Sequence, residues 1–378
     1  MKIYRSGLGC KMSVKVIFAG GGTGGHLFPA LAVARELERL SPGVIISFLS
    51  TGRPLEKQIL KQYEYETLEI KSPRKATLKD KIFFPLRLTL AFSRSLFFLL
   101  KSRATATVVV GLGGYGSLAP LVAAHILRLP TAILEPNLLP GEANRRLSHW
   151  VNEVYCQWEG SRKYFREKSK VFATGNPVRE EVTLSRGDSS YKNFGLSPKR
   201  KTLLVLGGSL GAEAINEALM QTIEGFGPRR QEIQVIHQTG LGKDTGYSMG
   251  YWAAGFPAYV TEFIDDMGAA YEAADLVICR AGATTISEIT ARGLPAILIP
   301  YPLATENHQY YNAKILEDAG AAILLEQKDL EPQALAALIK GLLADEGRLQ
   351  AMARASISLS RPEARNLVAR RILDLAEV

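Results

Sequence analysis

The chain has 378 residues, which is too long for one ordinary domain and sufficient for two. Its 47% hydrophobic content allows sizeable cores and argues against bulk disorder. The three cysteines lie far apart, which argues against a disulfide framework or a zinc site and indicates reduced thiols in a cytosolic protein. Residues 1–175 carry 26 basic and 12 acidic side chains, whereas the remainder carries 20 and 25. The basic first half therefore indicates an anionic partner, either nucleic acid or an anionic membrane surface.

The N-terminus does not resemble a signal peptide. Its apolar run at 14–19 is short and leads directly into glycines. The first dozen residues are compatible with a disordered extension, which leaves Met1 and Met12 as alternative start positions.

Strands and helices alternate through the first half of the chain. A buried strand at 14–19 precedes a glycine loop at 20–26 and a helix at 28–40, with Pro29 at the start of that helix. Further strands are predicted at 45–49, 107–110, 131–134, 153–156 and 171–173, with a helix at 54–62 and helical stretches between most of them. This alternation predicts a parallel, doubly wound sheet.

The same pattern begins again at Lys201, with a strand, a glycine loop and a helix. We therefore predict two similarly built α/β domains, residues 1–175 and 176–361, joined near Gly175-Asn176-Pro177. The last helix, about residues 362–378, is expected to cross back onto the first domain. The predicted strands of the second domain are 202–206, 234–237, 258–260, 276–278, 296–299 and 322–325, and the last three helices of the chain are 332–344, 346–356 and 364–376.

Residues 82–100 are rich in Phe and Leu, yet Arg87, Arg94 and Lys101 recur every seven residues along and just beyond them. This is not a transmembrane span, because the charges interrupt the apolar run. On a helix the three charges form one stripe. Further basic residues flank the segment, namely Lys71, Arg74, Lys75, Lys79, Lys81 and Arg103. Two interpretations remain open: a helix that lies on an anionic bilayer, or a well-buried core helix with a narrow solvated stripe.

The segment 275–312 has the pattern of a sugar-nucleotide site. A helix predicted at 284–291 begins where a short buried strand ends, and its free N–H groups and dipole suit a diphosphate. Thr284, Thr285 and Ser287 add hydroxyl donors, and Glu288, about one turn further, could accept hydrogen bonds from both hydroxyls of a ribose. The alternative is an ordinary βαβ unit with a polar cap.

Two glycine loops in the basic half, 20–26 and 111–117, could jointly cradle a diphosphate. The first is not a clean GxGxxG and no acidic residue ends the second strand, which disfavours a nicotinamide cofactor. His26 lies in the first loop, at the sheet edge where open α/β folds bind ligands, and could deprotonate a hydroxyl nucleophile. The alternative is that both loops are structural turns and that His26 only caps or orients one of them.

No side-chain cluster has the spacing of metal ligands, so we predict no metal and no cofactor. If a diphosphate leaves during a reaction, helix dipoles and hydroxyl groups would have to stabilise it.

Five stretches of the chain, taken together, resemble one family. They are residues 19–29 (AGGGTGGHLFP), 113–115 (GGY), 175–179 (GNPVR), 207–212 (GGSLGA) and 280–288 (RAGATTISE). Their order and separations resemble the MurG family, the peptidoglycan N-acetylglucosaminyltransferases of glycosyltransferase family 28, over about residues 14–375. The resemblance implies a GT-B fold, in which two Rossmann-like domains face a cleft. It also implies inverting transfer of N-acetylglucosamine from UDP-N-acetylglucosamine to the C4 hydroxyl of the MurNAc of lipid I, giving lipid II and UDP.

The resemblance places the donor site mainly in the second domain. Ser209 and the helix from Ala283 would hold the diphosphate, Glu288 the ribose, the backbone of Ile264 the uracil, and Gln309 the sugar. The complete implied set is Thr23, Gly24, Gly25, Asn137, Arg179, Ser209, Ile264, Ala283, Thr284, Thr285, Ile286, Ser287, Glu288 and Gln309.

The acceptor side is implied to use the glycine loops of the first domain. Its diphosphate would meet Gly22, Gly113, Gly114 and Tyr115, and His26 is the candidate base or base-orienting residue. The Glu-Gln-Asn of the family is Glu135-Pro136-Asn137 here. A side-chain contact from the missing Gln is therefore not carried over, whereas that of Asn137 is.

A lipid-linked acceptor implies a peripheral protein at the cytoplasmic face of the inner membrane. It favours the bilayer interpretation of residues 71–103, and contacts with other cell-wall synthesis proteins are compatible with it. Nucleic acid is not expected, because the basic half lacks a known module or an interleaved basic-aromatic motif.

Three alternative functions remain open. Another GT-B lipid glycosyltransferase, such as a diacylglycerol glycosyltransferase, would differ in acceptor. A sugar-nucleotide 2-epimerase would need extra catalytic carboxylates in the cleft. A membrane-docked binding subunit would not need a donor half and His26 in one chain.

Overall fold

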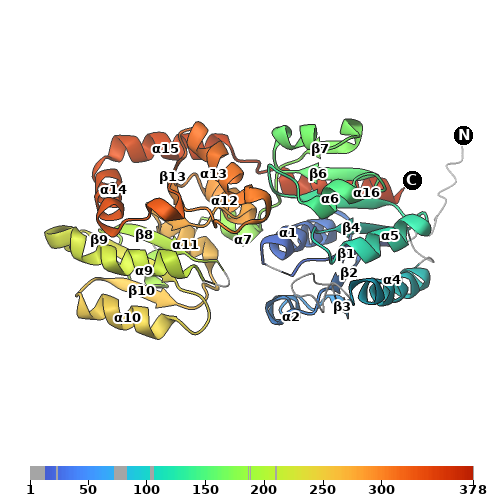
Figure 1. Ribbon diagram of the computed structural model, residues 1–378, viewed down its shortest axis with the longest axis horizontal. Helices are drawn as coiled ribbons and strands as arrows, with labels where there is room; N and C mark the ends of the chain where they lie inside the picture. Colours follow the sequence, from blue (N-terminus) through green and yellow to red (C-terminus); the bar gives the residue numbers. More distant parts are fainter. Residues whose placement is uncertain are drawn as a thin grey trace, which may run out of the picture.

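The computed structural model describes residues 13–22, 24–71, 83–102, 106–185, 187, 189–208 and 211–377. Two α/β bodies lie side by side, each built on its own sheet (Figure 1). The strands of the first sheet are β1 (Val14–Ala19), β2 (Ile45–Ser50), β3 (Glu66–Glu69), β4 (Ala106–Gly111), β5 (Thr131–Glu135), β6 (Glu153–Cys156) and β7 (Val171–Ala173). They are all parallel, in the order β3-β2-β1-β4-β5-β6-β7.

The second sheet repeats this plan. Its strands are β8 (Lys201–Leu206), β9 (Ile233–Gln238), β10 (Ala258–Thr261), β11 (Leu276–Cys279), β12 (Ala296–Leu298) and β13 (Ala322–Leu324), all parallel, in the order β10-β9-β8-β11-β12-β13. The predicted doubly wound α/β class is therefore confirmed. In both sheets the strand order reverses beside the first strand, at β1/β4 and β8/β11, where open sheets bind ligands.

Helices cover both faces of each sheet, which explains why the central strands are continuously apolar. The first body contains α1 (Gly24–Leu40), α2 (Pro54–Lys61), α4 (Phe84–Lys101), α5 (Leu118–Ile126) and α6 (Glu142–Leu147). Later in the chain come α7 (Glu180–Thr183), α8 (Ser189–Lys192), α9 (Glu213–Thr222), α10 (Asp244–Ala253), α11 (Met267–Ala273), α12 (Ala283–Arg292), α13 (His308–Asp318), α14 (Pro332–Ala344), α15 (Glu346–Ser358) and α16 (Ala364–Ala376).

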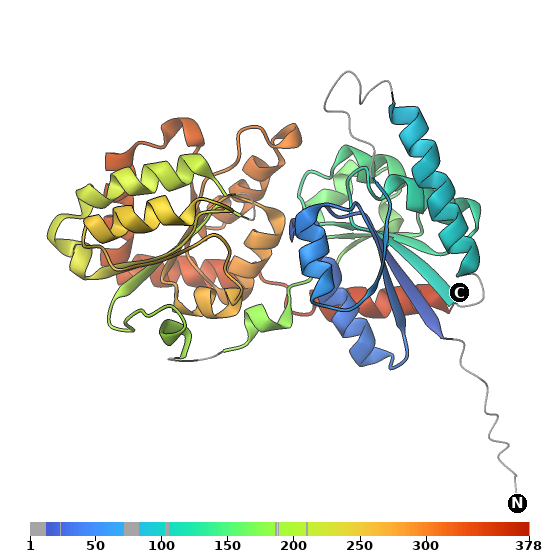
Figure 2. The same ribbon diagram turned by 90° about the horizontal axis from the view of Figure 1, so that it is seen from below.

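The last helix, α16, packs on the first sheet although it follows the second in sequence. Figure 2 shows it running along the first body. Val368, Ala369 and Ile372 are fully buried in the same core as α1 and β1. Polar contacts also hold it there: Asn366 Nδ2 donates to Glu36 on α1 at 2.8 Å, Arg365 pairs with the same carboxylate, and Arg371 pairs with Glu153 on β6.

Strand β3 was missed in the sequence, because Glu66 and Glu69 do not look like strand residues. It forms the edge of its sheet, where β2 is its one strand neighbour among the described residues. Both glutamates are exposed and paired with lysines, Glu66 with Lys15 and Glu69 with Lys57. Charged side chains are common on such edges because they discourage pairing with another chain.

The position of Pro29 was predicted wrongly. Helix α1 begins at Gly24, so Pro29 lies inside the helix and the end of the glycine loop forms its first turn. Proline has no N–H, and the carbonyl of Gly25 therefore lacks the helical hydrogen bond that residue 29 would normally donate.

Helix α4 is not the well-buried core helix that remained open as an alternative. Only Ala91, Ser95 and Leu99 are buried, along one stripe that faces α5. The exposed large apolar side chains along it are Phe83 (49%), Leu86 (57%), Leu90 (56%), Phe97 (62%) and Leu100 (45%). Among the described residues, no helix combines the length and apolarity needed to cross a membrane. Most of the predicted flanking lysines and arginines, Arg74, Lys75, Lys79, Lys81 and Arg103, lie outside the described residues.

Candidate functional site

The two glycine loops of the first body pack directly against each other at the β1/β4 switch point. A Cβ atom at Gly20 would lie 3.0 Å from the carbonyl oxygen of Gly113, and one at Gly116 would lie 3.1 Å from the Cα of Gly20. Ser117 joins the loops by donating hydrogen bonds to the carbonyls of Ala19 and Gly113. Glycine is needed at positions 20 and 113 because both have positive φ angles, 101° and 95°, and the backbones approach closely.

His26 lies in the first turn of α1, against this pair of loops. A Cβ atom at Gly113 would be 3.7 Å from His26 Nε2 and 3.3 Å from Asn144 Nδ2. The other ring nitrogen, Nδ1, lies 3.4 Å from the carbonyl oxygen of Gly21. Burial lowers the pKa of His26 below its usual value, and the nearby charges of His308 and Arg53 lower it further. The hydrogen bond to Gly21 acts in the opposite direction and raises the pKa. The imidazole is therefore neutral near pH 7 and able to accept a proton.

Arg53 brings positive charge to the first glycine loop, which the sequence alone did not indicate. Its Nη1 donates to the carbonyl of Gly22 at 2.8 Å. Glu56 lies on the other side of the loop, where a Cβ atom at Gly21 would approach its Oε1. Burial raises the pKa of Glu56, and its hydrogen bonds with Thr51 oppose that rise.

A cavity of about 1310 Å³ lies between the two bodies. The first body contributes α1, α2 and the linker residue Arg179, and the second contributes the glycine loop after β8, the loop before α11, and the start of α12. Of the residues predicted to bind substrate, eight line it: Gly24, Gly25, Arg179, Ile264, Thr284, Thr285, Glu288 and Gln309. The volume is sufficient for a nucleotide sugar, since drug-sized ligands occupy pockets of roughly 300–1,000 Å³.

The N-terminus of α12 opens into this cavity. Its N-cap residue is Gly282, which has no side chain to satisfy the first N–H groups of the helix. Gly282, Thr284 and Thr285 all line the cavity. Helix α12 has ten residues, so unpaired donors and the positive end of its dipole face the cavity together, as an anion site requires.

Thr284 connects this helix to the first body. Its Oγ1 donates to the carbonyl oxygen of Gly25 at 2.6 Å. That carbonyl is the one left without a helical donor by Pro29. Pro29 thus leaves the Gly25 carbonyl free, and Thr284, 255 positions further along the chain, supplies its donor across the cleft.

Glu288 is held by two donors from different elements. Tyr271, on α11, donates to Oε2 at 2.9 Å, and Nη2 of Arg179 lies 3.4 Å from Oε1. The guanidinium of Arg179 also lies 4.0 Å from the centre of the Phe28 ring on α1. Burial raises the pKa of Glu288, while the charge of Arg179 and the hydroxyl of Tyr271 oppose that rise.

A second contact between the bodies is formed by Asn312 on α13, whose side chain is fully buried. Its Oδ1 accepts from the N–H of Leu138, and its Nδ2 donates to Asn137 Oδ1, both at 3.0 Å. Asn137 in turn donates to Glu135, a buried carboxylate that also accepts from Gly141 and Asn144. Burial raises the pKa of Glu135, which these four donors oppose. The network runs from the second body to the glycine loops.

Known proteins resemble the whole chain. The glycosyltransferase family 28 N-terminal domain matches residues 16–156, and the family 28 C-terminal domain matches residues 202–368. A Myxococcus xanthus protein is 39% identical over 369 residues, covering 96% of this chain and 93% of its own. It is named UDP-N-acetylglucosamine–N-acetylmuramyl-(pentapeptide) pyrophosphoryl-undecaprenol N-acetylglucosamine transferase. The crystal structure of Acinetobacter baumannii MurG superposes with a TM-score of 0.73 at 30% identity, covering 95% of this chain and 99% of the other.

This chain belongs to the MurG family within glycosyltransferase family 28. The GT-B arrangement implied by the sequence motifs is thereby confirmed. A UDP-GlcNAc 2-epimerase from Neisseria meningitidis, solved with UDP-GlcNAc bound, has a TM-score of 0.66 at 16% identity, covering 96% of this chain and all of its own. This second likeness concerns the fold alone.

The remaining MurG-family positions lie outside the cavity wall or outside the described residues. Thr23 and Ser209 are not described. Gly22, Gly113, Gly114 and Tyr115 lie at the paired glycine loops, beside His26. The other four have structural contacts. Ile286 is fully buried in a core of the second body, and Ala283 begins α12. Ser287 donates to the carbonyl of Ala283 and accepts from Asn176, and Asn137 accepts from Asn312.

The sequence motifs of the MurG family did not indicate Tyr271, Arg53 or Asn312. Each acts through a partner on a different element, so no local pattern marks it. Asn312 is 175 residues from Asn137, and Arg53 is 31 residues from Gly22. Among these, Asn312 offers the clearest test of how the two bodies are joined.

We expect Asn312→Ala to destabilise the protein by about 2–4 kcal/mol, since each buried polar group left without a partner costs roughly 1–3 kcal/mol. Denaturant unfolding should detect this loss. Asn193→Ala, which removes an exposed amide bonded to Asp266, should change stability by less than about 0.5 kcal/mol. Equal stabilities of the two variants would contradict the role assigned to Asn312.

Proposed function

We propose that this protein transfers N-acetylglucosamine from UDP-N-acetylglucosamine to the C4 hydroxyl of the MurNAc of lipid I, producing lipid II and UDP. The observation that carries this proposal is the cavity between the bodies, into which the N-terminus of α12 and the carboxylate of Glu288 both open. The names of full-length relatives at 37–39% identity supply the substrates. The alternative is another lipid acceptor, such as diacylglycerol, with the same donor.

The donor would lie along the second body. The N–H groups at the start of α12 meet its diphosphate, and Glu288 accepts hydrogen bonds from the ribose. Ile264 and Gln309 line the same cavity and are assigned to the uracil and to the sugar. When the sugar–phosphate bond breaks, the dipole of α12 stabilises the charge that develops on UDP.

The acceptor would approach from the first body. Gly22, Gly113, Gly114 and Tyr115 receive its diphosphate, with Arg53 supplying positive charge at the carbonyl of Gly22. His26, adjacent to Gly113, takes the proton of the attacking hydroxyl. The hydroxyl oxygen attacks the anomeric carbon, the bond to the UDP oxygen breaks, and the configuration inverts.

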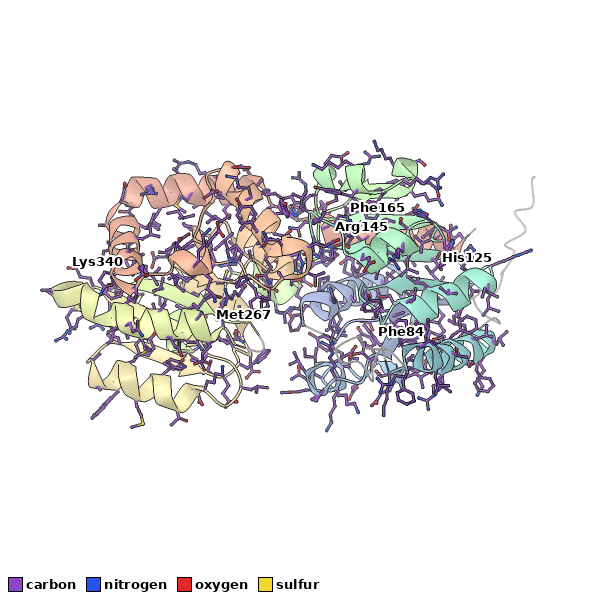
Figure 3. All side chains as sticks on the ribbon, in the orientation of Figure 1. Phe84, His125, Arg145, Phe165, Met267 and Lys340 are labelled. Atoms are coloured by element: carbon purple, nitrogen blue, oxygen red, sulfur yellow. The ribbon has the colours of Figure 1, made fainter. Side chains whose placement is uncertain are left out.

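The proposed membrane contact is α4, at the anionic cytoplasmic face. Its exposed apolar side chains are flanked by Arg87 and Arg94, which are also exposed. Phe84, at the start of α4 (Figure 3), lies edge-on to the ring of Tyr115 with centroids 6.0 Å apart. This contact joins the membrane helix to the acceptor loop, as a lipid-linked substrate requires.

The proposed reaction is tested by UDP release from UDP-N-acetylglucosamine, with a lipid I analogue, with diacylglycerol, and without acceptor, all in EDTA. We expect release only with the lipid I analogue, and we expect it in EDTA because the dipole of α12 is assigned to the charge that develops on UDP. Release with diacylglycerol alone would show that the acceptor is wrong. Failure to bind the nucleotide sugar would contradict both the proposed reaction and the assignment of Glu288 to the ribose.

The role of His26 predicts a pH dependence. A base must be unprotonated, so kcat/KM should fall as the pH drops through the pKa of His26, which burial places below the usual 6.5. His26→Ala should lower kcat by about 10²–10⁴-fold and remove this acidic limb. The exposed His149→Ala serves as the control and should keep both rate and profile. An acidic limb that persists in His26→Ala would assign the base elsewhere.

Membrane docking through α4 predicts binding to vesicles that contain anionic lipid in preference to neutral phosphatidylcholine vesicles. Leu90→Glu should weaken that binding by about tenfold or more, because burying one large apolar side chain contributes roughly 1.5–3 kcal/mol. Ile357→Glu alters a comparably exposed position on α15 and should leave vesicle binding unchanged. Equal losses in the two variants would contradict a specific role for α4.

A further inference from the structure

Tyr271 is a buried tyrosine whose hydroxyl group serves a site residue. Only 1% of its surface is exposed, and its ring packs in the core beneath β11 and α12. Tyr271 lines the cavity, one turn along α11 from Met267, which also lines it. It donates to Glu288 Oε2 at 2.9 Å.

The two oxygens of Glu288 are held unequally. The contact of Oε1 with Arg179 is 3.4 Å, longer than a charge-assisted hydrogen bond of about 2.7–2.9 Å. The contact from Tyr271 is the shorter one, so this hydroxyl determines how the carboxylate is turned. A carboxylate has about four acceptor positions. With two taken, two remain for the neighbouring hydroxyls of a ribose.

We propose that Tyr271 is a positioning residue that fixes the carboxylate of Glu288 for the ribose diol and so makes the site selective for ribonucleotide donors. The inference rests on the proposed function, in which Glu288 contacts the ribose. Its physical basis is that a buried acceptor rejects a ligand without the matching hydroxyl, provided that the acceptor cannot turn away to another partner.

The chain contains a matched control for the loss of a buried tyrosine hydroxyl. Tyr251, on α10 in the same body, is also 1% exposed, and its hydroxyl lies 3.1 Å from His237 Nδ1. That hydroxyl belongs to the core below β9 and is distant from Glu288 in the packing of the domain. Tyr251→Phe therefore removes the same atom from a similar environment without altering the ribose acceptor.

The test compares binding of UDP and of 2′,3′-dideoxy-UDP by titration calorimetry, using the full chain. The wild type should prefer UDP. Tyr271→Phe should weaken UDP binding about tenfold, because a Glu288 carboxylate that is free to turn loses about one hydrogen bond from the ribose hydroxyls. Binding of dideoxy-UDP, which lacks those hydroxyls, should change by no more than about twofold. Tyr251→Phe should alter neither affinity. If Tyr271→Phe unfolds at the assay temperature, Tyr271→Met also lacks the hydroxyl and fills the site adaptably.

The outcomes separate the inference from the function beneath it. A wild type without any preference for UDP would overturn the ribose contact of Glu288 and the role of Tyr271 with it. A wild type that prefers UDP, together with a Tyr271→Phe variant that retains the whole preference, would overturn the role of Tyr271 alone. Equal weakening of both ligands would also overturn it, because that pattern indicates general distortion of the domain.

Discussion

The site depends on two helix N-termini that face each other across the cleft. Helix α1 begins at the switch point of the first sheet and α12 at that of the second (Figure 1). The hydrogen bond from Thr284 to the carbonyl of Gly25 joins them. The Gly25 carbonyl can accept this bond because Pro29 has no N–H to donate to it. The missing hydrogen bond within α1 is therefore replaced by one between the two domains. The ligand cavity lies beside this junction.

Charge within the cleft differs between the two proposed ligand regions. Around the proposed donor region, the carboxylate of Glu288 is compensated by Arg179 and Tyr271, which leaves acceptor capacity for hydroxyl groups. Around the acceptor loops, Arg53 and the positive ends of helices face the region assigned to a diphosphate. The neutral imidazole of His26 lies between these regions and adds no positive charge before it takes a proton. This division suits a reaction that moves a sugar from one diphosphate to another substrate.

The surface of the first body carries the proposed lipid contact. Helix α4 buries one narrow stripe and leaves most of its apolar side chains exposed, which is unusual for a helix that only completes a core. Its first residues contact Tyr115, next to the paired glycine loops. The return of α16 to this body adds buried area to its core, and the ion pair of Arg371 with Glu153 fixes it there. A firmly packed first body supports both α4, the proposed membrane contact, and the glycine loops proposed to bind the acceptor.

The sequence by itself determined the two doubly wound domains, the glycine loops, the helix that starts after the strand at 276–279 and the family, because apolar periodicity, glycine clusters and motif spacing are local properties. It did not determine β3, since edge strands tolerate charged residues, nor the start of α1, since glycines before a proline carry no helix signal. Only the tertiary structure decided that Tyr271 holds Glu288, that Asn312 meets Asn137, and that α4 remains exposed. Those outcomes depend on which surfaces meet after folding, and a hydrogen bond between residues on separate elements leaves no pattern along the chain.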